Sequence, residues 1–366
     1  MTTASKGFSV FASTSQARVA LRATAFAVGL ALAAPAVATS DPFDLSALVS
    51  DLAGAAPTLD ADLVNPWGIA FNPNGTAWVA NNRSGKATLY DGNGVKQGLV
   101  VTIPANGAGQ GTPTGVVFNG TPDFKFATTP GATPVAASFL FVSMDGLVSA
   151  WAPGITTAVP VAMQPGSIYT GVALSGNGTV NRLYAADFFG GKIDVYSNAF
   201  APTSVPGGFV DASIPEGYGP FNVTAIQGNL YVAYAKIGDR GVDRGAGRGF
   251  VRVFDADGYL VDRGLSRGHL NAPWGIALAP AGFGRFSNRL LVGNFGDGVI
   301  NAYDAASGGF VGSLRTGSGK PERIDGVWAI AFGNGVRGQH TDALFFAAGV
   351  ADETHGEYGR IDADED

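Results

Sequence analysis

The sequence predicts an all-β fold, a six-bladed β-propeller whose ring is closed by an N-terminal strand that completes the last blade. Two features of composition favour strands and turns over helices. The chain has 54 glycines among 366 residues, about twice the average usage. It has 14% charged residues beside an ordinary 46% of hydrophobic ones. Glycine destabilises helix interiors, and a disordered chain would need lower hydrophobicity and higher charge. The third observation is a motif that returns six times.

The repeated motif is an apolar strand that opens with Pro-Trp-Gly or a variant of it. Residues 66–71 read PWGIAF, residues 273–278 read PWGIAL and residues 327–332 read VWAIAF. Weaker copies, PTGVVF, YTGVAL and PFNVTA, begin at positions 113, 169 and 220. Six copies spaced by roughly fifty residues are typical of a propeller.

Each copy continues with the same order of elements. A second apolar strand is expected at residues 76–80, 138–143, 182–186, 229–233, 289–293 and 343–347. A glycine-containing turn then leads to a third strand with alternating polarity that ends in an aromatic residue, as at residues 87–91, 192–196, 251–255 and 299–304. Alternation of this kind indicates a half-buried strand. A fourth strand follows, for example at residues 259–262 and 310–314.

The last copy is incomplete, because only the short acidic tail 363–366 follows its third strand at residues 357–361. An apolar segment at residues 43–52 precedes the first copy. We expect this segment to supply the missing outer strand, since closing the ring removes exposed sheet edges. The prediction is a single propeller domain over residues 39–362.

The first 38 residues have the pattern of a secretory signal peptide. A basic start without acidic residues precedes an apolar run at residues 23–34, and residues 36–38 read AVA, a small-residue cleavage pattern. The apolar run is too short to span a bilayer. We therefore expect a secreted protein, extracellular or periplasmic, with no membrane insertion after cleavage. The chain has no cysteine, which excludes a disulfide framework.

The charge of the chain excludes one class of partner. There are 29 acidic against 23 basic residues, a formal net charge of −6. Binding to nucleic acid depends on cationic groups that neutralise phosphates. We therefore expect no nucleic-acid partner.

Several phrases resemble a known group of proteins. Residues 63–68 read LVNPWG, 270–275 LNAPWG, 220–223 PFNV, 291–298 LVGNFGDG and 325–330 DGVWAI. With these phrases the chain resembles six-bladed NHL-like and TolB-like propellers, and most of all a family of secreted bacterial propellers. The resemblance covers nearly all of the chain after the leader. It implies the fold, and it implies no reaction, because that family has no assigned one.

A propeller offers a ligand site at one mouth of its central channel. The inner-strand starts and the residues after the second strands would meet there and form a polar and aromatic site for a small molecule or an extended chain. The predicted ligand-binding residues are Asn65, Trp67, Asn82, Arg83, Asp145, Asp187, Asn222, Trp274, Asn294 and Trp328. The alternative is that the Asn and Asp residues cap turns and that the indoles pack between blades.

A calcium site is the sharper alternative. Six-bladed lactonases and related hydrolases hold a Ca²⁺-type ion in the channel with carboxylate and amide oxygens, as hard cations prefer. By this resemblance Asp145, Asp187 and Asn294 would be the metal ligands, and Ca²⁺ is the one candidate cofactor. Those enzymes place a glutamate at the start of the first blade, where this chain has Asn65. That difference counts against hydrolysis.

Two further features carry weaker predictions. Glu353 and His355 are close in sequence and form a conceivable acid–base pair, with a solvated loop as the alternative. Residues 237–249 interrupt the fourth repeat with five charged residues among glycines, which indicates a lid or recognition loop or else an unstructured excursion.

The function predicted from the sequence is therefore a secreted propeller that binds a small ligand or protein partner at the mouth of its channel, with no assignable reaction. A calcium-dependent lactonase-like or esterase-like hydrolase is the first alternative. An extracellular scaffold for protein interactions, with the blade edges as its interface, is the second.

Overall fold

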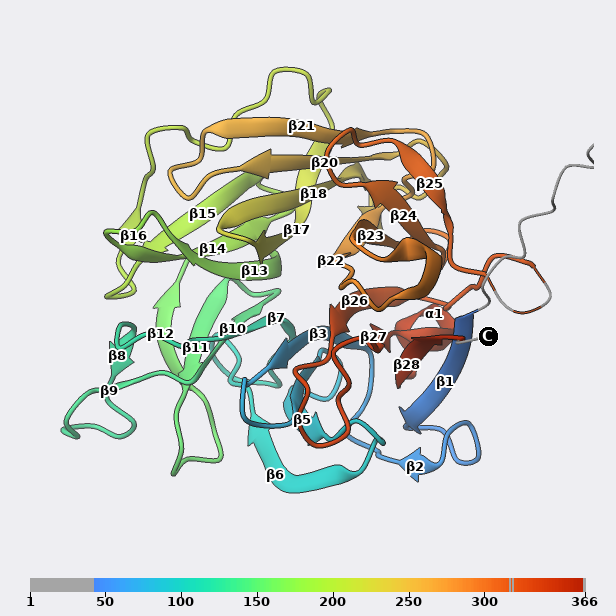
Figure 1. Cartoon of the computed structure of the whole chain (residues 1–366). Helices are drawn as coiled ribbons and strands as arrows, with labels where there is room; N and C mark the ends of the chain where they lie inside the picture. Colours follow the sequence, from blue (N-terminus) through green and yellow to red (C-terminus); the bar gives the residue numbers. More distant parts are fainter. Residues whose placement is uncertain (1–42, 316, 318, 365–366) are drawn as a thin grey trace, which may run out of the picture. The chain divides into compact units, whose positions relative to one another are not determined.

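The computed structural model describes residues 43–315, 317 and 319–364, and in this range six β-sheets lie around a central channel (Figure 1). The predicted signal peptide lies outside the described residues. The six-bladed all-β prediction is confirmed. The only helices in the described part are the 3-10 turn η1 (Gly284–Phe286) and the four-residue α1 (Val350–Glu353). None of the described helices has the length and apolar character needed to cross a membrane.

Each of the first five blades is an antiparallel sheet that runs outward from the channel in chain order. Blade 1 is β3 (Pro66–Phe71), β4 (Ala77–Asn81), β5 (Lys86–Tyr90) and β6 (Lys96–Thr102). Blade 2 is β7 (Pro113–Phe118), β10 (Phe139–Ser143), β11 (Leu147–Trp151) and β12 (Val159–Met163), and the small pair β8 (Lys125–Phe126) and β9 (Val135–Ala136) stands beside it. Blade 3 is β13 (Tyr169–Gly176), β14 (Asn181–Asp187), β15 (Lys192–Ser197) and β16 (Pro202–Thr203). Blade 4 is β17 (Tyr218–Ile226), β18 (Asn229–Gly238), β20 (Gly249–Phe254) and β21 (Leu260–Ser266). Blade 5 is β22 (Pro273–Leu278), β23 (Arg289–Asn294), β24 (Ile300–Asp304) and β25 (Phe310–Ser313).

The sixth blade joins the two ends of the described chain. It contains β26 (Val327–Phe332), β27 (Leu344–Ala348), β28 (Glu357–Ala363) and, as outer strands, β1 (Phe43–Ser50) and β2 (Thr58–Leu59). β1 pairs antiparallel with β28 along its whole length, from Phe43 opposite Ala363 to Ser50 opposite Glu357. The predicted closure of the ring by an N-terminal strand is thus confirmed. The pairing satisfies the backbone groups that β28 would otherwise leave at a sheet edge.

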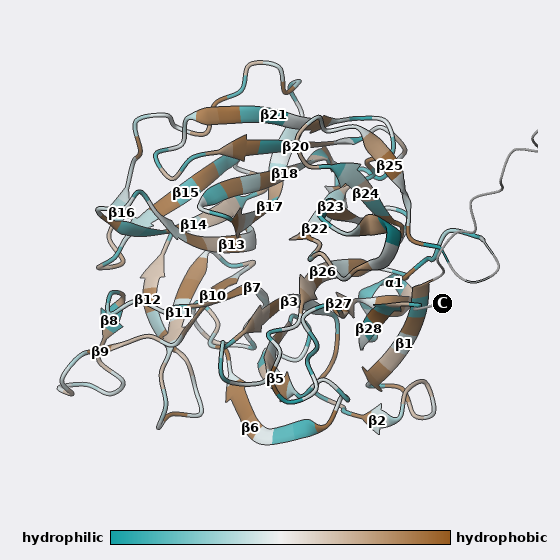
Figure 2. Ribbon diagram, in the orientation of Figure 1, coloured by the Kyte–Doolittle hydropathy of each residue, from teal (hydrophilic) through white to brown (hydrophobic). Residues whose placement is uncertain are grey.

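In the two Pro-Trp-Gly copies the third residue is glycine because the inner strands of neighbouring blades touch there, whereas the blade 4 copy has Asn222 at that position. A Cβ atom placed on Gly68 would lie 2.8 Å from the carbonyl oxygen of Thr114 in the next inner strand. A Cβ on Gly275 would lie 2.5 Å from the carbonyl oxygen of Trp328 in the same way. The glycine therefore sets how closely the blades approach. Figure 2 shows that apolar residues occur along the strands that surround the channel.

Residues 237–249 differ from the predicted interruption of the fourth repeat. β18 continues to Gly238, and the chain turns back as β19 (Gly241–Val242), which pairs with the end of β18. The amide of Asp243 also donates to the carbonyl of Lys236 at 2.8 Å. The segment 236–244, called the β18–β19 hairpin below, is therefore an extension of a blade strand with regular pairing. Two residue pairs and the Asp243 amide hold the hairpin by its backbone, and Ile237 and Val242 pack against the buried cluster that includes Trp67 and Phe221.

Candidate functional site

A cavity of about 770 Å³ lies at the mouth of the channel on the side where the inner strands begin. We call it the mouth cavity. One wall is the β18–β19 hairpin, and aromatic residues from five blades (1, 3, 4, 5 and 6) form another part of the lining. Met144, Ile168, Thr170, Phe189 and Glu353 complete the lining. The volume falls in the range of pockets that enclose small molecules.

The aromatic floor of the mouth cavity consists of Trp67, Phe188, Phe221, Phe295 and Trp328. Trp328 is stacked between Trp67, at 3.6 Å between ring centroids, and Phe295, at 4.0 Å. Phe221 packs against Trp328 and Phe188 at 5.6 and 4.8 Å. These rings come from the inner ends of different blades, so the floor exists only when the ring is assembled. The five side chains are between 1% and 4% exposed because they pack on one another, so the floor is a close-packed aromatic base of the cavity.

The hairpin supplies the charged side of the cavity. Arg244 lies with its guanidinium carbon 4.2 Å from the centre of the Phe295 ring. Its Nη2 atom is 3.8 Å from Oε1 of Glu353, across the mouth. Lys236 pairs with Asp243 at 3.1 Å within the hairpin itself. Arg244 is therefore the hairpin residue that bridges to the aromatic floor and to blade 6.

Glu353 is held by an unusual backbone. Ala351, Asp352 and Glu353 have φ values of 54°, 53° and 63°, so three consecutive non-glycine residues are left-handed. Such residues cost about 1–3 kcal/mol each and persist only where surrounding contacts impose them. The amide of Ala351 donates to Asp325 at 2.9 Å. The amide of Glu353 donates to the carbonyl of Gly349 at 3.2 Å. The left-handed turn directs the Glu353 carboxylate to the cavity.

The predicted residue Asn65 fixes this carboxylate without lining the cavity. Its Nδ2 donates to Glu353 Oε2 at 3.2 Å, and its Oδ1 accepts from Trp328 Nε1 at 3.2 Å. A Cβ on Gly349 would lie 2.1 Å from that Oδ1, so only glycine fits there. Burial raises the pKa of Glu353, against the hydrogen bond from Asn65 and the charge of Arg244.

The three predicted indoles lie between two cavities. Trp67 and Trp328 line the mouth cavity, whereas Trp274 lines a second, inner cavity of about 380 Å³. Trp274 Nε1 donates to the carbonyl of Thr170 at 2.9 Å. Asn222 donates to the carbonyl of Trp274 at 2.9 Å and also faces the inner cavity. All three indoles are buried, as the packing alternative predicted.

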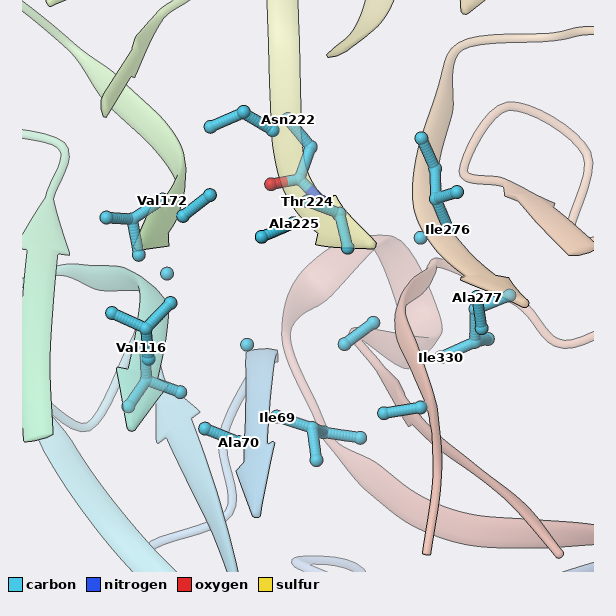
Figure 3. Close-up of a pocket in the computed structure, with 18 of the residues that line it drawn as sticks. Ile69, Ala70, Val116, Val172, Asn222, Thr224, Ala225, Ile276, Ala277 and Ile330 are labelled. Carbon is cyan, nitrogen blue, oxygen red and sulfur yellow. The ribbon is translucent and has the colours of Figure 1, made fainter. Parts of the chain in front are cut away.

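The inner cavity is walled by the inner strands of all six blades. Figure 3 shows the aliphatic side chains of Ile69, Val116, Val172, Ile276 and Ile330 around it, with Asn222 and Thr224 as its labelled polar side chains. It has few groups that would orient a ligand, so we place the candidate site at the mouth cavity.

The three predicted metal ligands all have protein partners. Asp145 accepts from the amides of Asn106 and Leu147 at 2.6 and 3.3 Å. Asp187 accepts from the Ser167 hydroxyl at 2.8 Å and from the amides of Ile168 and Gly190. Asn294 is fully buried, donates to the carbonyl of His269 and accepts from the amide of Asn271. Asp145, Asp187 and Asn294 come from three different blades and share no hydrogen-bond partner. The calcium site therefore stays a prediction.

Within residues 43–315, 317 and 319–364, no three His, Cys, Asp or Glu side chains gather in a way that would hold a metal ion.

Two other predicted residues lie at the rim. Asn82 is buried and donates to the carbonyls of Thr112 and Pro113, both at 3.3 Å, and so joins blades 1 and 2. Arg83 is exposed, and its charge lowers the pKa of Glu353 in opposition to burial. Arg83 therefore contributes charge to the mouth, and Asn82 contributes structure.

The conceivable acid–base pair of Glu353 and His355 does not form. His355 Nδ1 lies 2.9 Å from Asp51, and the neighbouring Gly356 amide donates to the same carboxylate at 2.8 Å. Glu353 instead meets Asn65 and Arg244.

The chain is similar to known proteins in sequence and in fold. No protein-family model matches the chain. Uncharacterized protein R648 of Acanthamoeba polyphaga mimivirus is 37% identical over 335 residues, which cover 87% of this chain and 80% of R648. Uncharacterized protein L690 of the same virus is 34% identical over 336 residues, 87% of this chain and 85% of L690. The chain belongs to the R648 and L690 family.

A solved structure titled streptogramin B lyase aligns with this member of the R648 and L690 family at a TM-score of 0.51. The sequences are 12% identical, and the alignment covers 88% of this chain and 98% of the other. At that identity the match shows the propeller fold alone. The relatives in the R648 and L690 family are viral, whereas the sequence resemblance pointed to bacterial proteins. The bacterial and NHL-like assignment stays a prediction.

The sequence contains signals for three residues of the aromatic floor that the predicted site does not include. Phe221 occupies the position of Trp67 in its own repeat, so alignment of the repeats places it in the aromatic floor. Phe188 and Phe295 directly follow the predicted residues Asp187 and Asn294 at the ends of β14 and β23. Arg244 lies in the charged segment 237–249 that the sequence indicated as a lid or recognition loop, but its contacts with Phe295 and Glu353 had no signal, because these partners lie far along the chain.

Proposed function

We propose that this protein binds a small molecule in the mouth cavity, between the β18–β19 hairpin and the aromatic floor. The observation that carries the proposal is the combination of a cavity of about 770 Å³ with an aromatic floor and charged groups that converge on it from the hairpin and from Glu353. Ligand sites are typically apolar hollows with a few placed polar groups.

The two sides of the cavity would recognise different parts of a ligand. The aromatic floor suits a flat or apolar part, which gains by leaving water. The opposite rim carries Lys236, Arg244 and Glu353, which suit a polar part. Phe189 is 43% exposed beside this rim and is free to cover a bound molecule. The rigid ring keeps these groups in place, so little ordering is needed on binding.

A thermal-shift screen of small aromatic compounds tests this function, with wild type compared with Phe189→Ala and Tyr259→Ala. Phe189 lines the cavity, whereas Tyr259 is 53% exposed at a blade edge and serves as the matched aromatic control. A compound that raises the melting temperature of wild type should bind at least tenfold more weakly to Phe189→Ala and equally well to Tyr259→Ala. Equal loss in both variants, or a screen in which nothing binds, would overturn the proposal.

The proposal includes export of the protein, based on the signal-peptide pattern of residues 1–38. Expression of the full chain in a secreting host tests this. Mass spectrometry should find a mature N-terminus at Thr39 in the exported fraction. Uncleaved chain that stays inside the cells would contradict it.

A further inference from the structure

Building on the proposed function, we infer that the ligand of the mouth cavity is an organic cation, a molecule with a guanidinium, amidinium or ammonium group. Arg244 of the hairpin occupies the place of that group and acts as an internal competitor. A ligand would displace the Arg244 side chain from Phe295 and Glu353.

The place that Arg244 occupies has the two parts that recognise organic cations. Its guanidinium carbon lies 4.2 Å from the centre of the Phe295 ring, which is within cation–π range. Its Nη2 is 3.8 Å from the Glu353 carboxylate, at the long end of ion-pair distances. An aromatic face beside a carboxylate attracts any cation of similar size, whether it belongs to the chain or to a ligand.

The two partners of this contact are held very unequally. Glu353 is fixed by the left-handed turn and by the amide of Asn65, and its side chain is 28% exposed. Arg244 is 44% exposed and follows the short β19 strand, which pairs with β18 through only two residue pairs. A fixed acceptor opposite a weakly anchored cation is the arrangement of a site with a replaceable occupant. The hairpin itself is anchored by Ile237 and Val242, which pack against the buried aromatic cluster, so the exchange requires only the half-exposed Arg244 side chain to move.

Glu353 is the carboxylate that we expect to receive the cation of the ligand, because the nearest carboxylate of the hairpin already has cationic partners. Asp243, the nearest hairpin carboxylate, is paired with Lys236 at 3.1 Å and also with Arg248. Trp328 and Trp67 continue the stack behind Phe295, and the face of Phe295 that Arg244 covers is the end of this stack. We therefore expect a flat cation such as an amidinium to take the position of the Arg244 guanidinium on that face.

The test is isothermal titration calorimetry with three probes of one shape and different charge: benzamidine, benzamide and benzoate. The proteins are wild type, Arg244→Ala, Arg244→Gln, Glu353→Gln, the Arg244→Ala/Glu353→Gln double variant and Phe189→Ala. The control is Arg285→Ala, an exposed arginine whose guanidinium carbon lies 4.9 Å from the centre of the Phe286 ring, outside the cavity lining. Both Arg244 variants should bind benzamidine at least tenfold more tightly than wild type, and Arg285→Ala should equal wild type. Adding Glu353→Gln to Arg244→Ala should remove the binding. Benzamide and benzoate should gain nothing.

Unchanged benzamidine affinity in both Arg244 variants, with melting temperatures that show them folded, would overturn the inference. So would an equal gain for benzamide. If benzamide or benzoate binds wild type and loses affinity in Phe189→Ala while benzamidine does not bind, the proposed small-molecule function stands and only the cation inference fails. If the compound screen and all three probes fail, both are wrong.

Discussion

Trp328 shows how one side chain can support both the fold and the site. It is 1% exposed, lies between the rings of Trp67 and Phe295, and donates its Nε1 hydrogen to Asn65. Asn65 in turn holds Glu353. The stability of the ring centre and the position of the carboxylate therefore depend on the same indole.

Replacing Trp328 by alanine should lower the free energy of unfolding by about 3–5 kcal/mol, because it leaves a cavity among buried rings. Trp328→Phe should cost less, since it keeps the stacking and loses the hydrogen bond to Asn65. Urea unfolding followed by circular dichroism measures both. A loss below about 1 kcal/mol for the alanine variant would show that the indole is not a packing residue.

The buried ion pair of Asp211 and Arg252 predicts that the folded protein loses stability in acid. Both side chains are 2% exposed, and Arg252 Nε donates to Asp211 at 2.5 Å. Burial raises the pKa of Asp211, but hydrogen bonds from the Ser213 hydroxyl and amide and the Arg252 guanidinium outweigh this and lower the pKa to about 2. Because the pKa is lower in the folded state, the contribution of Asp211 to stability is present above the ordinary aspartate pKa and is lost as pH falls towards 2.

Urea unfolding of wild type and Asp211→Asn between pH 5 and pH 2.5 checks this linkage. Wild type should lose stability more steeply with acid than the variant, whatever their absolute difference. Parallel curves for the two proteins would show that Asp211 does not carry the effect.

Glu353 should respond to pH in the opposite direction. Burial is the largest influence and raises its pKa, as does Asp352, while Asn65, Arg244 and Arg83 lower it. A raised pKa in the folded state means that stability falls as pH rises from the ordinary glutamate pKa through the raised one. Glu353→Gln should remove this fall, which melting curves between pH 4 and pH 7 would detect. An unchanged pH profile in the variant would contradict the assignment.

At the scale of elements, β1 decides whether the ring closes. Its pairing with β28 buries Phe43 and Val49 and covers the edge of the sixth blade. A chain that begins at residue 53 lacks both. We expect it to lose more than about 5 kcal/mol of unfolding free energy, from two large buried side chains and a strand of hydrogen bonds, and to aggregate through the exposed edge.

Size-exclusion chromatography and thermal melting measure the effect of this truncation, with a chain that begins at residue 43 as the control. The control should elute and melt like the mature protein that begins at residue 39. A chain from residue 53 that elutes and melts like the control would show that β1 is dispensable for closure.

The pairing of β19 with β18 is a feature that the sequence did not predict. The charges and glycines of residues 237–249 indicated an insertion, but its pairing with β18 depends on backbone geometry that the repeats do not contain. The repeats predicted the blade strands well, because alternation, glycine turns and the Pro-Trp-Gly motif are local features repeated six times. The position of a single insertion has no such repetition to support it.

At the scale of the whole molecule, a bound ion would stabilise the folded ring by mass action. The carboxylate oxygens of Asp145 and Asp187 accept hydrogen bonds from backbone amides. The side-chain amide of Asn294 donates through its nitrogen and accepts through its oxygen. We therefore expect a chelator to leave the melting temperature unchanged. Elemental analysis of the purified protein, paired with melting curves with and without EDTA, tests this. Stoichiometric calcium whose removal lowers the melting temperature would revive the calcium-dependent hydrolase prediction.

The sequence alone determined the architecture of this protein, because six copies of one local pattern each specify the same blade and the incomplete last copy requires a closing strand. It also indicated the residues near the mouth, since equivalent positions of a repeat meet around one axis. Only the tertiary structure decided which of them are packing and which face the cavity. The contact of Arg244 with Phe295 and Glu353 joins three distant segments, and no local pattern encodes such a meeting. It arises because the ring closes and a hairpin from one blade reaches across to another.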